Sequence, residues 1–143
     1  MSLENILKSA SAIAGAVTGY FFGAFDGFFY AMITFVVVDY ITGILCAIVK
    51  KQLSSEIGFK GISKKVCIFI LIGVAYIIDT NLLHESGVLR TTVIFFYIAN
   101  EGISIIENAA LLGLPIPTKL VSSLVQLKKK FEDKDEEKDN DKK

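Results

Sequence analysis

Five polar side chains lie within an apolar stretch that is long enough to cross a lipid bilayer. As an α-helix, residues 91–114 would extend for about 36 Å, compared with a hydrocarbon core of about 30 Å. At about 100° per residue, the five side chains fall within one third of the helix circumference: Asn100, Glu101, Ser104, Glu107 and Asn108. Because such groups must face protein or water at this depth, the stripe predicts either hydrogen bonds to neighbouring helices or a water-facing functional surface.

A further acid interrupts a second apolar segment. Asp39 lies near the centre of residues 27–49, so in an antiparallel arrangement it would reach about the same depth as Glu101. In a closed bundle we expect the Asp39 carboxyl to be neutral and hydrogen-bonded to a neighbouring helix, because burial disfavours the charged form.

The composition indicates a small polytopic membrane protein. The chain has 143 residues, of which 52% are hydrophobic, and a mean hydropathy of +0.55, which is too apolar for an ordinary soluble domain. Its charges cluster between apolar runs, so no nucleic-acid surface is predicted. The single histidine has no ligand partners at useful spacing, and we expect no metal or cofactor. No nucleophile, base and orienting group occur at a spacing typical of an enzyme.

The apolar runs predict an all-α membrane domain over residues 1–114 with four transmembrane helices. The expected spans are 9–25, 27–49, 66–83 and 91–114. The first of these would be only about 25 Å long as a helix, which is short for a bilayer. Three spans are therefore the alternative, in which only the N-terminus changes side.

Small residues recur at intervals of four near the N-terminus: Ser11, Gly15, Gly19, Gly23 and Gly27. Such spacing favours close approach of a second helix, although glycine is also generally common in membrane helices. Gly43, in the second span, is a further candidate for helix packing.

The segment between the second and third spans sets the expected orientation. It carries five lysines, which are Lys50, Lys51, Lys60, Lys64 and Lys65. The positive-inside rule places this loop in the cytoplasm, where we expect it to lie on the lipid headgroups, with Ser63 as the N-cap of the next helix. Four spans then put both termini in the cytoplasm.

The C-terminal part of the chain separates into two segments. Residues 115–132 have apolar side chains at helical spacing, which predicts a cytoplasmic amphipathic helix that lies on the membrane or packs with copies of itself. Residues 133–143 carry lysines and acids and no apolar residue, so we expect a disordered tail.

Several of these motifs together resemble a known family. Asp39, Thr42, Gly43 and Ala47 precede the lysine-rich segment, which contains Ser54, Ser55, Gly58 and the sequence Gly-Ile-Ser-Lys-Lys at 61–65. The most specific motif is Asn-Glu-Gly-Ile-Ser-Ile-Ile-Glu-Asn at 100–108, followed by Gly-Leu-Pro-Ile-Pro at 113–117. This combination resembles the phage lysis and toxin-secretion holins of Gram-positive bacteria and their phages.

The resemblance implies a non-enzymatic protein of the bacterial cytoplasmic membrane. Such a protein would contact membrane lipid, form homo-oligomers and open lesions that release an endolysin or a large toxin. Two alternatives remain open from the sequence. The intramembrane acids would also suit a narrow ion channel or transport subunit, and an antiholin or membrane scaffold would make no hole.

Overall fold

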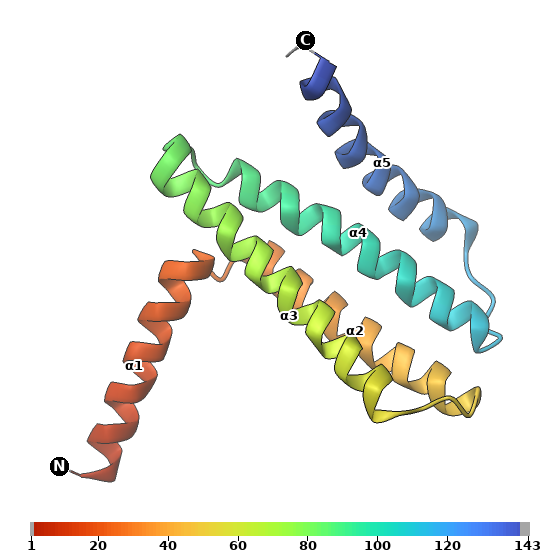
Figure 1. Ribbon diagram of the computed structural model, residues 1–143, viewed down its shortest axis with the longest axis horizontal. Coiled ribbons are helices and arrows are strands. Elements are labelled where there is room, and N and C mark those ends of the chain that lie inside the picture. The colour runs from red at the N-terminus through yellow and green to blue at the C-terminus, as the bar shows by residue number, and fades with distance from the viewer. Residues whose placement is uncertain (1, 141–143) are drawn as a thin grey trace.

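The computed structural model describes the backbone of residues 2–140 and the side chains of residues 2–130, and this part of the chain is all-α (Figure 1). The fold class agrees with the prediction. Its elements are α1 (Leu3–Phe22), α2 (Gly27–Val49), α3 (Ser55–Ile78), the π-helical turn η1 (Asp79–Leu83), α4 (Val88–Leu111) and α5 (Thr118–Asn140).

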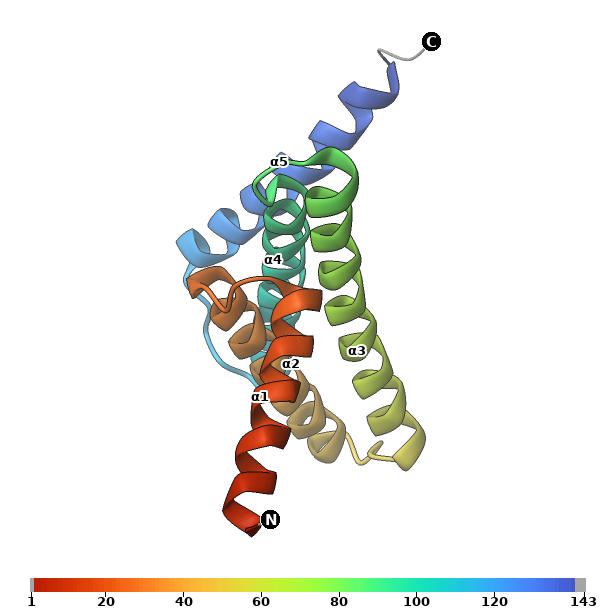
Figure 2. The same cartoon turned by 90° about the vertical axis from the view of Figure 1, so that its left-hand side faces the viewer.

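The core lies between α2, α3 and α4, which run side by side and alternate in direction (Figures 1 and 2). Its buried apolar residues come from all three helices at helical spacing: Phe29, Met32, Val36, Ile68, Ile72, Ile94 and Ile98. Two of the helices begin at side-chain caps, since the Asp26 carboxylate accepts from the backbone N–H of Phe29 and the Ser54 hydroxyl accepts from that of Ile57.

Three helices in the described part of the chain are long and apolar enough to cross a membrane. They are Gly27–Val49, Ser55–Leu83 and Val88–Leu111. The expected first span, residues 9–25, overlaps α1, which ends at Phe22 and is not among them. Three spans, the alternative from the sequence, are therefore what length and composition support.

The α1 helix projects away from the bundle (Figures 1 and 2). The small residues that we expected on one continuous helix face are divided between α1, its C-cap and α2. Gly23 has a φ of 76°, which ends α1, and Gly27 already belongs to α2. A Cβ atom added at Gly15, Gly19 or Gly27 would meet nothing within 4 Å. Within the chain, these glycines therefore pack against no helix.

Two phenylalanines at the end of α1 contact the bundle: Phe22 packs on Phe29 and Phe69, and Phe21 packs against α3. A Cβ atom added at Gly73 in α3 would lie 2.0 Å from the Phe21 ring, so this glycine provides the space that the ring occupies. Gly43 lies close to Asn108, whose side-chain nitrogen is 3.8 Å from the position of an added Cβ.

The predicted basic loop is much shorter in the structure. The helix α3 begins at Ser55, eleven residues before the expected start at 66, so Lys60, Lys64 and Lys65 are helical. Only Lys50 and Lys51 remain in the connection between α2 and α3. The predicted N-cap at Ser63 is wrong, because Ser54 is the residue that precedes the helix. Ser63 lies within the helix, where its hydroxyl donates to the carbonyl of Phe59.

The C-terminal helix also differs from the prediction in length and in position. No glycine or proline follows Pro117, and α5 continues to Asn140 through most of the expected disordered tail; residues 141–143 lie outside the described residues. Figure 1 shows α5 turning back along α4. There a Cβ atom added at Gly102 would lie 3.0 Å from Leu124, so α5 packs on α4.

Candidate functional site

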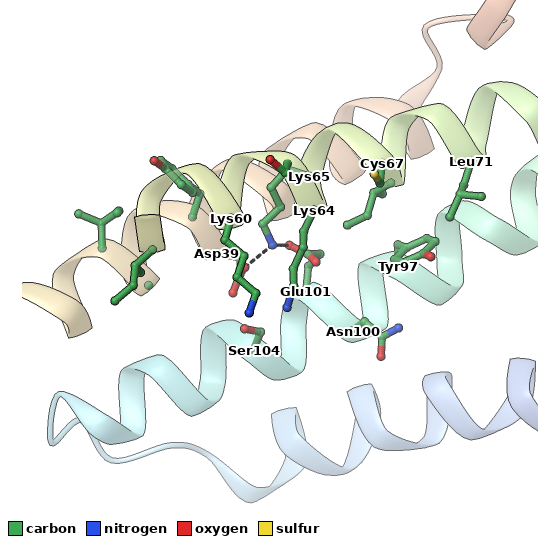
Figure 3. A pocket seen from close by; sticks show the side chains of 17 residues that line it. Asp39, Lys60, Lys64, Lys65, Cys67, Leu71, Tyr97, Asn100, Glu101 and Ser104 are labelled. Carbon is green, nitrogen blue, oxygen red and sulfur yellow. Dashed lines mark hydrogen bonds and ion pairs between the residues drawn. The ribbon is translucent and has the colours of Figure 1, made fainter. Parts of the chain in front are cut away.

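Three charged side chains from three helices meet in the interior of the bundle. The Lys65 ammonium of α3 forms ion pairs with the carboxylates of Asp39 in α2 and Glu101 in α4 (Figure 3). We call these residues the charged cluster. Asp39 and Glu101 are only 8% and 7% exposed, so their charges are compensated by Lys65 and not by solvent.

A second layer of polar contacts holds Asp39. The side-chain nitrogen of Asn108 donates to Asp39 Oδ1 at 3.4 Å and to the Thr42 hydroxyl oxygen at 3.0 Å. Thr42 donates in turn to the Asp39 carbonyl at 3.0 Å, and the Cys46 thiol donates to the Asn108 carbonyl at 3.2 Å. These contacts join α2 to α4 next to the charged cluster.

The other members of the predicted stripe are distributed differently. Asn100 and Ser104 line a cavity of about 770 Å³ beside the charged cluster (Figure 3). Glu107 is exposed and takes no part in the cluster. Its position at the edge of the stripe turns it away from α2 and α3, because the helix rotates by about 100° per residue.

The expectation that Asp39 would be hydrogen-bonded to a neighbouring helix is confirmed, and one of its partners is the Lys65 ammonium of α3. We expected Lys65 in a cytoplasmic loop. The relevant signal was the charge balance, since two acids at membrane depth need a compensating cation. Lys65 is the last cation before the third apolar run.

A second buried cation was also missed by sequence analysis. Arg90, at the start of α4, is 5% exposed and donates to three acceptors on the segment that joins α1 to α2. Its Nε donates to the carbonyl of Phe22 at 2.8 Å, Nη2 to that of Ala24 at 2.7 Å, and Nη1 to the Asp26 carboxylate at 2.9 Å.

Two carboxylates complete this end of the bundle. Asp79 accepts from the backbone N–H groups of Leu89 and Arg90 at 3.0 and 2.7 Å, and so caps the start of α4. Partial burial opposes ionisation of Asp26, but the backbone N–H of Phe29 and the Arg90 guanidinium lower the pKa of Asp26 below its ordinary value.

The charged cluster and the contacts of Arg90 lie in a closed bundle whose buried polar groups are satisfied. Every buried side-chain nitrogen and oxygen has a hydrogen-bond partner within the described residues. In the same part of the chain, no group of three metal-ligating side chains occurs. The arrangement therefore compensates charge between helices.

Residues 16–129 match the bacteriophage holin family. A probable holin of Bacillus phage phi105 is 39% identical over 93 residues, which are 65% of this chain and 68% of the phage protein. An uncharacterized protein of Listeria innocua is 42% identical over 139 residues, covering 97% of this chain and 99% of the relative. A 14.9 kDa protein from the nagH 3′ region of Clostridium perfringens is 40% identical over 129 residues, or 90% and 98% of the two chains. No solved structure matches.

Proposed function

Because the chain belongs to the bacteriophage holin family, we propose that it forms homo-oligomers in the bacterial cytoplasmic membrane. There it opens lesions that release an endolysin or a large toxin. Family membership and three apolar helices indicate a membrane protein. The assembly, the lesion and the released protein are the proposed part.

The observation that carries this proposal is the charged cluster between the three apolar helices. Charged groups at membrane depth are costly unless they are paired or face water. In the closed bundle Lys65 compensates Asp39 and Glu101, whereas in an open lesion water would solvate all three. The same side chains thus suit both a dry resting state and a wet open state, as a membrane lesion requires.

We base a proposed orientation in the membrane on the charges at the two ends of the bundle. We propose that Lys50 and Lys51 face the cytoplasm, as positively charged connections do, and that Arg90 lies near the outer surface. The helix α1 has 20 residues, or about 30 Å, and exposes apolar side chains along its length. As a fourth span it would place both termini in the cytoplasm.

The helix α5 must take another position when α4 is inserted. Leu124 packs on Gly102, beside the charged cluster, and the lysines at 128–130 follow one turn later. Each charged residue at the bilayer centre costs about 2.5–3.5 kcal/mol or more. We propose that α5 then lies on the cytoplasmic surface with its apolar face towards the acyl chains.

Induced expression with an endolysin that lacks its own export route tests the function. We expect cell lysis only when both proteins are present, measured as loss of turbidity. The endolysin alone and this protein with an inactive endolysin are the controls. Loss of membrane potential without endolysin release would instead support a narrow ion channel. Normal growth and membrane potential would support an antiholin or a scaffold.

A further inference from the structure

A groove follows one face of α3 along most of its length. Its first part is the cavity of about 770 Å³ beside the charged cluster, and its second part is a cavity of about 340 Å³ between α3 and α4. The two parts adjoin, because Leu71 and Tyr97 line both. We call the whole depression the α3 groove.

The charge of the α3 groove is concentrated at one end. Lys60 and Lys64 are one helical turn apart on the groove face of α3, and their side chains extend towards α4 beside Lys65 (Figure 3). Lys65 is occupied by the two carboxylates of the charged cluster. Within the described residues, neither Lys60 nor Lys64 has an ion-pair partner. Both ammonium groups are therefore available to an anion.

Away from the lysines and the charged cluster, the groove is mainly apolar. Beyond the lysines, its walls on α3 are Ile68, Leu71, Val74 and Ile78, and α4 contributes Val93 and Phe96. From Lys64 to Ile78 the helix rises by about 21 Å. Half of a typical hydrocarbon core is about 15 Å, so the apolar part is long enough for one acyl chain.

We propose that the α3 groove binds one anionic phospholipid of the cytoplasmic leaflet. Its phosphodiester lies between the ammonium groups of Lys60 and Lys64, and one acyl chain lies along Ile68 and Leu71. Three lysines against the two acids Asp39 and Glu101 leave one positive charge at this end of the groove, which favours an anionic over a zwitterionic headgroup. The inference does not depend on lesion formation.

The distribution of charge favours a lipid over a helix from a second copy. A phospholipid has its charge at one end and an apolar chain along the rest, which is the pattern of the groove. Lysines that extend from a transmembrane helix to the headgroup level also lie where lipid phosphates are concentrated. The binding energy of this site comes from two charge contacts and from burial of the chain.

Tryptophan fluorescence can detect this lipid, because the sequence contains no tryptophan. We would introduce Leu71→Trp as a probe in the groove and, in a separate variant, Ile70→Trp as the matched control. Ile70 and Leu71 are 48% and 45% exposed, but only Leu71 lines the groove. Each full-length protein is reconstituted in phosphatidylcholine vesicles containing a small fraction of brominated phosphatidylglycerol or brominated phosphatidylcholine.

We expect the brominated anionic lipid to quench the Leu71→Trp probe at much lower mole fraction than the zwitterionic lipid. At about 1 kcal/mol for each lysine and 1.4 kcal/mol for each factor of ten, the preference is about 30-fold. The Ile70→Trp probe should show little preference. Lys60→Gln with Lys64→Gln should remove the preference at Leu71→Trp, whereas Lys50→Gln with Lys51→Gln, which makes the same charge change outside the groove, should retain it.

Three results would overturn the proposal. They are equal quenching of the Leu71→Trp probe by both lipids, an equal preference at Ile70→Trp, and a preference that persists without Lys60 and Lys64. A probe shielded from both lipids would show that another copy of the chain occupies the groove. Circular dichroism of each variant checks that its helices form, and soluble glycerol phosphate should not relieve the quenching.

Discussion

Replacement of Lys65 by methionine removes the one cation that compensates two buried carboxylates. Methionine retains much of the length and apolar contact of the lysine side chain but has no charge. Asp39 and Glu101 are 8% and 7% exposed, so solvent cannot replace the ammonium while the bundle stays closed. Breaking a buried ion pair in this way costs about 3–5 kcal/mol. The closed bundle of Lys65→Met should therefore be about 100-fold to 4,000-fold less populated.

The contacts of the two acids differ, and this gives the prediction a second part. Asp39 keeps its hydrogen bond from Asn108 at 3.4 Å, whereas Lys65 is the hydrogen-bond partner of the Glu101 carboxylate. In the Lys65→Met background, Glu101→Gln should therefore recover more stability than Asp39→Asn. The double variant Lys65→Met with Glu101→Gln has no unpaired charge at position 101.

Unfolding of the helices by titration with sodium dodecyl sulfate in a zwitterionic detergent, followed by circular dichroism, measures these differences. Lys64→Met is the matched control, because Lys64 is adjacent, helical and without an ion-pair partner in the described part of the chain. We expect it to change stability by less than about 0.5 kcal/mol. The reasoning is refuted if Lys65→Met is no less stable than this control, or if Glu101→Gln recovers nothing.

Three further predictions concern the other contacts of the bundle. Arg90→Gln should lose about 3 kcal/mol of stability. Arg90→Lys should not restore it, because one ammonium cannot reach the acceptors at Phe22, Ala24 and Asp26 together. The same detergent titration measures both variants, and wild-type stability of Arg90→Lys would contradict this role. The folded-state pKa of Asp26 lies below its unfolded value. The contribution of Asp26 to the free energy of unfolding is therefore present above about pH 4 and is lost as pH falls through the folded pKa. Titrations of stability against pH should show this loss in the wild type but not in Asp26→Asn. Gly73→Leu should displace Phe21, whose ring lies 2.0 Å from an added Cβ, whereas a Cβ added at Gly15 has no neighbour within 4 Å. Proteolysis between α1 and α2 should therefore be faster in Gly73→Leu but not in Gly15→Leu. Equal rates in the two variants would contradict the contact between Phe21 and Gly73.

The sequence predicted the helices better than it predicted the contacts between them. The bounds of α2 are the predicted ones, and α4 is displaced by three residues, because long apolar runs define a helix regardless of its neighbours. The start of α3 was missed because the positive-inside rule locates lysines on one side of a membrane but does not separate loop from helix. Ser54 before Ile57 was the local signal for the true start.

The site was only half predictable for a related reason. Periodicity within α4 grouped Glu101 with Asn108, and both do contact Asp39 or its partner Lys65. Periodicity within one helix does not give the rotation of another helix around its axis. The approach of Lys65 and Arg90 to their acceptors depends on that rotation, so neither contact could be derived from spacing. The exposure of Glu107 follows from the same cause.

The accessibility of position 104 to water shows whether the surroundings of the charged cluster become hydrated when the bundle opens. Ser104 lines the cavity beside the charged cluster, and Ser104→Cys can be studied with Cys46 and Cys67 replaced. In cells without endolysin, a hydrophilic maleimide is added before and after the loss of membrane potential. We expect no labelling before that loss and strong labelling after it, as water enters the opened bundle. Equal labelling before and after, or none at either time, would contradict a cluster that changes from dry to wet.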